Sequence, residues 1–387
     1  MENSFYVLDY GARDDGSPCT AAIQRALDAC REAGGGTVVV PPGRFALAGV
    51  RMYSHTTLLL QRGAQLWGSD RCEDYPIFPL PPGLEPRDVP VLFPHYFQQV
   101  PPGYRRALIS AYGAEDIAII GEGDNVIDGA DCFDPQGEEG FRGPHGIYLS
   151  CCRNVRLAGY TIQNTGNFMH QLDNCQDVAI SRVTALGGHD GAHLGACRRV
   201  LLEHCIFHTG DDCIAGCNTQ DITVRHCDLN TACQCFRIGG RNLLVQGCRL
   251  WGPGIYPHRM SVVRGPRDAL PREQGRHNTL SAFLYLASAD APLPEPSGNW
   301  RVEDCTIENI DCLINYRAGD EERLQAGTPL ADITFRNTRI AGIREPSAVC
   351  GCPETPFTVA FADCPGAAEQ ARIQAGPFAS VHVRGAT

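Results

Sequence analysis

The sequence carries a repeat of about 22 residues, and this repeat constrains the fold more than any other feature. From residue 155 onward, successive repeats begin 23, 22, 22 and 21 residues apart, and each contains two pairs of apolar residues. The members of a pair are separated by one residue, which places both on the same face of a β-strand, whereas a helical repeat needs a longer run at a spacing of 3.6. The repeats are Val155/Leu157/Tyr160/Ile162, Val178/Ile180/Val183/Ala185, Val200/Leu202/Cys205/Phe207, Ile222/Val224/Cys227/Leu229 and Leu243/Val245/Cys248/Leu250, with later copies at Trp300/Val302/Cys305/Ile307 and Ile333/Phe335/Thr338/Ile340.

This pattern predicts an all-β fold, a single-stranded right-handed parallel β-helix in which residues 1–387 form one solenoid domain. Residues 17–33 are predicted to form a capping α-helix, with Ser17 as its N-cap. Such a cap would cover backbone edges and core that an open coil exposes. The stretches 72–104 and 252–298 interrupt the pattern with prolines and are predicted to be loop excursions over a cleft. The apolar face of the helix is Ala22, Ile23, Ala26, Leu27 and Cys30.

The charge composition excludes several classes of function. A net charge of −11 disfavours nucleic acid as a partner, and no apolar run is long enough for a membrane helix. All 33 basic residues are arginine, so mechanisms that depend on lysine are excluded. The first residues lack the basic start and apolar stretch of a secretory signal, which favours the cytoplasm, although a mature secreted form would look the same. The oligomeric state stays open.

The 20 cysteines raise the question of disulfides or metal. Cys205, Cys227, Cys248 and Cys305 recur at the repeat interval, which predicts a column of small buried thiols. The remaining short cysteine spacings lack the paired pattern of zinc sites. No metal and no cofactor are therefore predicted.

Three acids stand one repeat apart and form the predicted active site. Asp190 lies 21 residues before Asp211 and 22 residues before Asp212. Because neighbouring coils of a β-helix are about 4.8 Å apart, residues one repeat apart become stacked neighbours. A single aspartate in such a glycine-rich turn would usually be structural. Three in register suit glycoside hydrolysis, which needs one protonated acid and one carboxylate, and crowding of like charges keeps one of them protonated.

The sequence around these acids resembles glycoside hydrolase family 28, the polygalacturonase family of β-helical pectinases. The likeness covers most of residues 5–250 and runs in order through five segments. These are Tyr10-Gly11-Ala12 with the helix that follows, Arg106–Ile109, Gly121–Gly129, His189-Asp190-Gly191 and Thr209–Ala215. The resemblance implies that Asp211 is the general acid and that Asp190 and Asp212 orient the attacking water in an inverting reaction.

The chain departs from the family pattern where the sugar is held. His189 follows a glycine where the family has asparagine, and Gln234 stands between two cysteines where the family has a Gly-His-Gly motif. The family's Arg-Ile-Lys motif has no counterpart, and Arg259 is the nearest candidate for its arginine.

Strand alternation offers replacements for the missing residues. Tyr148, Gln171, His193, Ala215 and Arg237 are predicted to stack in one outward column beside the acids. Arg237 could bind a uronate carboxylate with both of its terminal nitrogens, or it could be an ordinary solvated arginine. The predicted substrate-binding residues are His189, His193, Gln234, Arg237 and Arg259, of which His189 could equally be an inert turn residue and His193 could act behind the acids.

Together these observations predict an inverting, exo-acting hydrolase of α-linked, uronate-containing pectic oligosaccharides. Two alternatives remain. A β-helical polysaccharide lyase would release an unsaturated product that absorbs ultraviolet light, and a non-catalytic glycan-binding β-helix would lose no function on Asp211→Asn.

Overall fold

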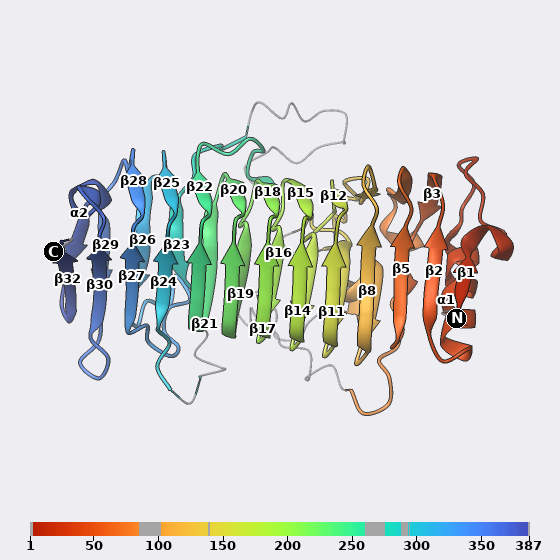
Figure 1. The fold of residues 1–387 in the computed structure, drawn as a ribbon, viewed down its shortest axis with the longest axis horizontal. Coiled ribbons are helices and arrows are strands. Elements are labelled where there is room, and N and C mark those ends of the chain that lie inside the picture. Colours follow the sequence, from red (N-terminus) through yellow and green to blue (C-terminus); the bar gives the residue numbers. More distant parts are fainter. Residues whose placement is uncertain are drawn as a thin grey trace. The chain divides into compact units, whose positions relative to one another are not determined.

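The computed structural model describes residues 3–84, 102–137, 140–259, 275–287, 293 and 295–385. The chain divides into two compact units, Met1–His189 and Asp190–Thr387. Within each unit the strands follow one another side by side in chain order (Figure 1). With 49% strand and 8% helix, and with parallel strand pairs, the right-handed parallel β-helix predicted from the repeat is confirmed. No helix among the described residues is long and apolar enough to cross a membrane.

The first unit consists of coils with three strands each. One face pairs β1–β2–β5–β8–β11–β14, a second pairs β4–β7–β10–β13, and a third pairs β3–β6–β9–β12–β15, all in parallel. Its elements are β1 (Ser4–Tyr6), η1 (Val7–Tyr10), α1 (Thr20–Glu32), β2 (Gly36–Val40), β3 (Gly43–Leu47), β4 (Val50–Arg51), β5 (Thr56–Leu60), β6 (Ala64–Gly68), η2 (Cys72–Asp74), η4 (Pro102–Arg105), β7 (Ala107–Tyr112), β8 (Glu115–Gly121), β9 (Val126–Asp128), β10 (His145–Ser150), β11 (Arg153–Ala158), β12 (Thr161–Gln163), β13 (His170–Asp173), β14 (Gln176–Ser181) and β15 (Thr184–Gly187).

The second unit repeats the same three faces. β17, β19, β21, β24, β27, β30 and β32 form one, while β18, β20, β22, β25 and β28 form another. The third face runs from β16 through β19, β21, β23, β26 and β29 to β31. The elements are β16 (Ala192–Gly195), β17 (Arg198–Glu203), β18 (Ile206–Thr209), β19 (Ile214–Arg225), β20 (Asp228–Thr231), β21 (Gln234–Gln246), β22 (Arg249–Trp251), β23 (Ser281–Tyr285), β24 (Trp300–Glu303), β25 (Thr306–Glu308), β26 (Cys312–Arg317), β27 (Asp332–Arg336), β28 (Arg339–Ala341), β29 (Ser347–Cys350), β30 (Phe357–Ala362), α2 (Ala367–Ala371), β31 (Ile373–Ala375) and β32 (Ala379–Arg384).

The apolar repeat sets the register of these strands. Val155 pairs with Val178 in the first unit, and Val200 pairs with Ile222 in the second. Even across the interruption after β22, Val245 pairs with Val302. One difference concerns the second excursion, because β23 lies inside the predicted loop 252–298 and pairs with β21 and β26. Residues 85–101 of the first excursion, and 260–274, 288–292 and 294 of the second, lie outside the described residues.

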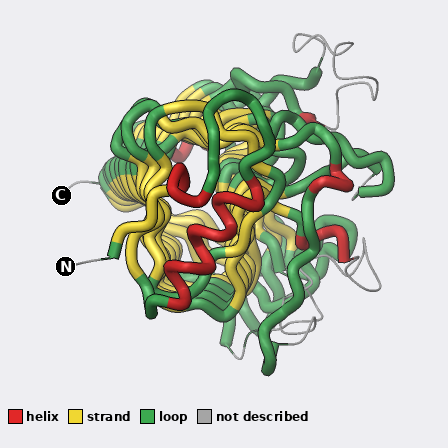
Figure 2. Tube along the Cα trace, turned by 90° about the vertical axis from the view of Figure 1, so that its right-hand side faces the viewer, coloured by secondary structure: helices red, strands yellow, loops and turns green. Residues whose placement is uncertain are grey.

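The helix α1 lies across the end of the first unit's coils (Figure 2). All five residues of its predicted apolar face are buried. Its start differs from the prediction, because the helix begins at Thr20 with Cys19 as N-cap, and no side chain caps it. Ser17 is not the cap: its backbone N–H binds the Asp15 carboxylate, and Pro18 forms a strand bridge to Ala46 that delays the first turn.

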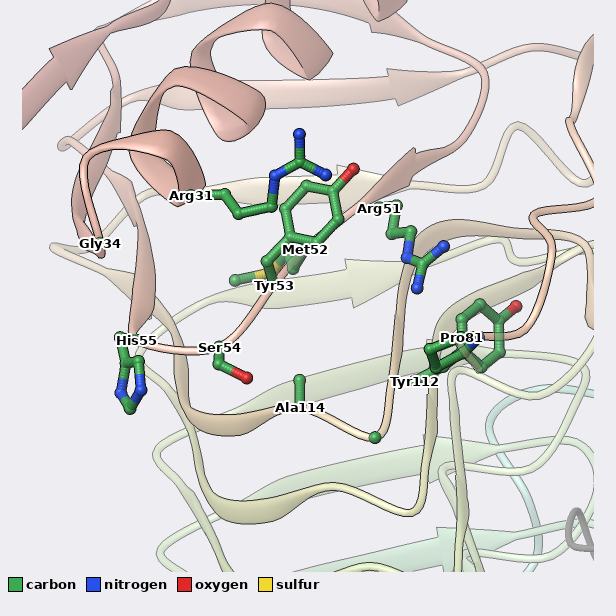
Figure 3. Close-up of a pocket in the computed structure, with 11 residues that line it drawn as sticks. Arg31, Gly34, Arg51, Met52, Tyr53, Ser54, His55, Pro81, Tyr112 and Ala114 are labelled. Atoms are coloured by element: carbon green, nitrogen blue, oxygen red, sulfur yellow. The ribbon is translucent and has the colours of Figure 1, made fainter. Parts of the chain in front are cut away.

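A pocket of about 330 Å³ lies beside α1 and contains none of the predicted site residues (Figure 3). The Arg31 guanidinium carbon lies 4.5 Å from the centroid of the Tyr53 ring, and that of Arg51 lies 5.5 Å from it. The Tyr53 hydroxyl donates to Asp28 of α1 at 2.9 Å. These contacts tie the helix to the loop that follows β4.

The predicted thiol column forms in the second unit. Cys205, Cys227, Cys248 and Cys305 are each at most 3% exposed, and none of the 20 cysteines forms a disulfide. Each thiol in this column donates to the backbone carbonyl two residues before it. The cysteines of the column thus pack in the core and form hydrogen bonds with the backbone between successive strands.

Asparagine and aspartate explain why the coils turn where they do. Asp221, Asn242 and Asn299 adopt the left-handed conformation, with φ of 58°, 58° and 55°. That conformation costs most residues about 1–2 kcal/mol, and a short polar side chain lowers the cost. The Asn242 amide donates to Asp221 at 2.6 Å, and the Asn299 amide donates to Asn242 at 2.9 Å. The turns therefore stack into a ladder that aligns successive coils.

Candidate active site

Asp190, Asp211 and Asp212 meet in the second unit. A carboxylate oxygen of each lies within 4.8 Å of one from each of the others. The cause is the strand register, in which Ala192 pairs with Ile214 and so sets Asp190 beside Asp212 at the strand entries. All three are buried, at 3%, 6% and 1% exposure respectively. The predicted convergence of the acids is confirmed.

Backbone and hydroxyl groups hold the paired acids in place. The Asp212 N–H donates to Asp211 Oδ1 at 3.1 Å, and the Gln234 N–H donates to Asp212 Oδ1 at 3.1 Å. The Thr209 hydroxyl donates to the Asp211 carbonyl at 2.6 Å, as does the Thr231 hydroxyl from the next coil. Groups fixed in this way are preorganised for a reaction.

Burial, reinforced by the neighbouring Asp211 carboxylate, raises the pKa of Asp212 to about 7. Arg237 opposes this shift because its charge favours the ionised carboxylate. Two acids this close titrate as a pair, so the pair retains a proton near neutral pH. The site therefore provides both a proton and a carboxylate.

The strand register aligns the members of the predicted column within each unit. Tyr148 pairs with Gln171 in the first, and Ala215 pairs with both His193 and Arg237 in the second. Burial alone would lower the pKa of Arg237. The charges of the Asp212 and Asp211 carboxylates outweigh this effect of burial and raise the Arg237 pKa. Arg237 is thus a counter-ion of the acids.

His193 supports Asp190. Its Nδ1 lies 3.1 Å from Asp190 Oδ2, and the two side chains are only 1% and 4% exposed. This contact orients the Asp190 carboxylate, and a role of His193 in the reaction stays a prediction.

For three other predicted substrate-binding residues, the structure gives the surroundings of the side chain. The Gln234 side chain accepts a bond from the Cys233 thiol at 2.8 Å, so at present it faces a protein group. His189, in the first unit, stacks on Phe141 with ring centroids 5.8 Å apart. Arg259 is partly exposed. Substrate binding by these residues stays a prediction.

The sequence reasoning missed His258 as a site residue. Its Nε2 lies 3.6 Å from Asp211 Oδ1, with the two side chains 14% and 9% exposed. His258 comes from the excursion after β22 and has no place in the repeat, so strand alternation could not locate it. Two features of the sequence could have indicated it. No histidine lies near Cys233 along the chain, where the family motif has one, and His258 lies in the loop that leaves the same coils.

Two overlapping groups of side chains near these acids have the spacing of metal ligands. One is Asp190, Asp211 and Asp212, and the other is Asp211, Cys233 and His258. Burial, followed by the charges of Asp212 and Asp211, raises the pKa of the Cys233 thiol well above its usual value. Near neutral pH this thiol is therefore protonated.

The coil fold and the acid cluster together define a parallel β-helix with three buried carboxyl groups at one site. Residues 97–233 match the family model described as Glycosyl hydrolases family 28. The resemblance predicted from the motifs is therefore confirmed over this segment, which is less than half of the chain.

Individual relatives agree with this family. An exo-poly-alpha-D-galacturonosidase from Dickeya chrysanthemi is 26% identical over 260 residues, a match that covers 54% of this chain and 41% of that relative. An exopolygalacturonase structure from Thermotoga maritima has a TM-score of 0.70 at 16% identity, covering 94% of this chain and 87% of that one. The surface protein and adhesin PfbA of Streptococcus pneumoniae has a TM-score of 0.58 at 13% identity, covering 98% and 97%. At these identities the structural likeness establishes the fold.

Proposed function

We propose that this chain is an inverting, exo-acting glycoside hydrolase of α-linked, uronate-containing oligosaccharides of the pectin type. The observation that carries the proposal is the meeting of three buried carboxyl groups within 4.8 Å in a family 28 segment. One protonated acid can donate to the leaving oxygen while carboxylates activate water.

In this mechanism Asp211 donates its proton to the glycosidic oxygen as the bond breaks. Asp190 and Asp212 accept hydrogen bonds from a water and take its proton as it attacks the anomeric carbon. Burial and the Asp211 charge raise the pKa of Asp212, whereas Arg237 and the Gln234 N–H oppose this shift, and the mechanism assigns the one proton that the pair retains to Asp211. His193 orients Asp190 for the same task.

The choice of a uronate substrate is supported by arginine in the outward column. Arg237 is partly exposed and lies among the acids, and a guanidinium can bind a substrate carboxylate with two parallel hydrogen bonds. The exo mode is supported by the name of the exo-acting relative.

The proposal is tested with pectic oligogalacturonates. Proton NMR should detect release of a single terminal sugar with its anomeric configuration inverted. Asp211→Asn should lower kcat by about 10²- to 10⁴-fold, which is the usual contribution of a general acid. Asp221→Asn is a matched control, because it makes the same change at an exposed turn of the same unit and should leave the rate unchanged.

Two results would contradict the proposal. Retention of configuration, or an unsaturated product that absorbs ultraviolet light, would mean a different reaction. The adhesin with this fold keeps a second candidate open, a non-catalytic glycan-binding protein. That candidate predicts binding of oligogalacturonate without turnover, equal in wild type and Asp211→Asn.

A further inference from the structure

Next to the acid pair, three side chains of different chemistry converge. They are the Asp211 carboxylate, the Cys233 thiol and the His258 imidazole, and one donor atom of each lies within 4.8 Å of the others. We propose that these residues bind a thiophilic divalent cation such as Zn²⁺, and that the bound cation inhibits the enzyme reversibly. The inhibition rests on the function proposed above, whereas the binding does not.

The donor spacing suits a tetrahedral ion. Zinc binds sulfur at about 2.3 Å and nitrogen or oxygen at about 2.0–2.2 Å, so its ligand atoms stand about 3.3–3.8 Å apart. His258 Nε2 and Asp211 Oδ1 are already 3.6 Å apart. The thiol sulfur lies within 4.8 Å of both, and a side-chain shift of about 1 Å would complete the set. Three protein ligands leave a fourth position for water.

The surrounding charges favour a cation. Asp190 and Asp212 add two further carboxyl groups beside Asp211, and the same three acids also have the spacing of metal ligands. The nearby cations Arg237 and Arg276 oppose a metal ion. On binding, the Cys233 thiol would lose its bond to Gln234 Oε1 and release its proton to solvent while a sulfur–zinc bond forms.

Metal binding has a direct consequence for the reaction. An Asp211 carboxylate that coordinates zinc cannot carry the proton that the leaving oxygen requires. The ligand set also explains why cysteine spacing in the sequence gave no sign of a metal site. Its members are 22 and 25 residues apart and come from two strand entries and a loop.

Binding is measured first, by titrating EDTA-treated protein with ZnCl₂ against a chromophoric chelator. Wild type should bind one tight equivalent, and Cys233→Ser and His258→Gln should each weaken it by about 100-fold or more. Cys312→Ser is the matched control, a half-buried thiol of the same unit that should not change binding at this site. Circular dichroism and thermal melting establish that each variant is folded. If Cys233→Ser does not fold, His258→Gln takes its place as the test variant.

Inhibition is measured second, as the rate with ZnCl₂ divided by each variant's own rate without it. Wild type and Cys312→Ser should be inhibited and then restored by EDTA, whereas Cys233→Ser should be insensitive at the same concentration. Equal zinc affinity in wild type and Cys233→Ser would overturn the proposal. A loss of affinity in Asp190→Asn alone would also overturn it, because the three aspartates would then bind the ion without Cys233 and His258. If the chain hydrolyses nothing, the binding titration still decides this proposal, and if hydrolysis occurs without zinc binding, only this proposal fails.

Discussion

At Asp212, catalysis and stability oppose each other. Burial and the Asp211 charge raise its pKa to about 7, whereas an aspartate in an unfolded chain titrates near 3.9. Between these two values the folded protein binds more protons than the unfolded chain, so stability falls as the pH rises through this window. The proposed mechanism uses the ionised carboxylate of Asp212, and this ionised form lowers the free energy of unfolding.

Asp212→Asn should therefore be more stable than wild type above neutral pH. We expect a gain of about 2–4 kcal/mol at about pH 8 and little change at about pH 4, because asparagine resembles the neutral acid and keeps Oδ1 for the Gln234 N–H. Urea unfolding at the two pH values measures the difference.

The control is Asp228→Asn, the same change at an acid whose pKa is lowered. Burial of Asp228 is outweighed by its bonds to His208 and Trp251. This variant should lose stability at about pH 8. A gain there, or no gain for Asp212→Asn, would be at odds with the charge argument.

Arg237 should set the pH range of activity. Because its charge favours ionised Asp212, Arg237→Gln should move the pH–rate profile of kcat upward by about one unit. Arg249→Gln, which breaks an exposed ion pair with Glu308 in the same unit, should leave the profile in place. A rise in KM with no shift in the profile would instead mean that Arg237 serves the substrate alone.

At the scale of elements, the thiol column shows which features of a cysteine the coil uses. Cys248 accepts a bond from the Cys227 N–H at 3.4 Å and donates to the Gln246 carbonyl at 3.3 Å. Thr338 occupies the equivalent position in a later coil and donates to the Arg336 carbonyl at 2.9 Å. The column therefore needs a small side chain that both accepts and donates.

Cys248→Thr should accordingly keep the free energy of unfolding within about 1 kcal/mol of wild type. Cys248→Ala should cost about 1–3 kcal/mol, because it removes packing and leaves the buried Cys227 N–H without its partner. Urea denaturation of the three proteins provides the comparison. Equal stability of the alanine and threonine variants would show that the hydrogen bonds contribute nothing.

The same elements show how far the sequence predicts the structure. Paired apolar residues predicted the coils, their register and the convergence of Asp190 with Asp211 and Asp212, because each depends only on the repeat. β23 and His258 were missed because they lie within an irregular excursion, whose path is decided by tertiary contacts rather than by local spacing. The start of α1 was also placed too early, since a strand bridge at Pro18 competes with the first helical turn.

At the scale of the whole molecule, charge opposes the proposed substrate. The chain carries a net charge of −11, and a pectic uronate is itself a polyanion. The approach of two like-charged partners is slowed at low ionic strength, where charges act over about 30 Å, and much less at physiological salt, where they act over about 8 Å. Arg237 counters this repulsion only at the acids themselves.

Added salt should therefore accelerate the reaction with the polymer. Between about 10 mM and about 150 mM NaCl, kcat/KM for polygalacturonate should rise about two- to fivefold, because the long-range repulsion is screened while the buried acid pair is not. Trigalacturonate, the oligosaccharide of three sugars, provides the control. Because it carries few charges, its kcat/KM should rise less with added salt, and its kcat should not change. A fall in kcat/KM with salt would mean that arginines along the cleft attract the substrate more strongly than the remaining charge repels it, and that local charge rather than net charge controls its capture.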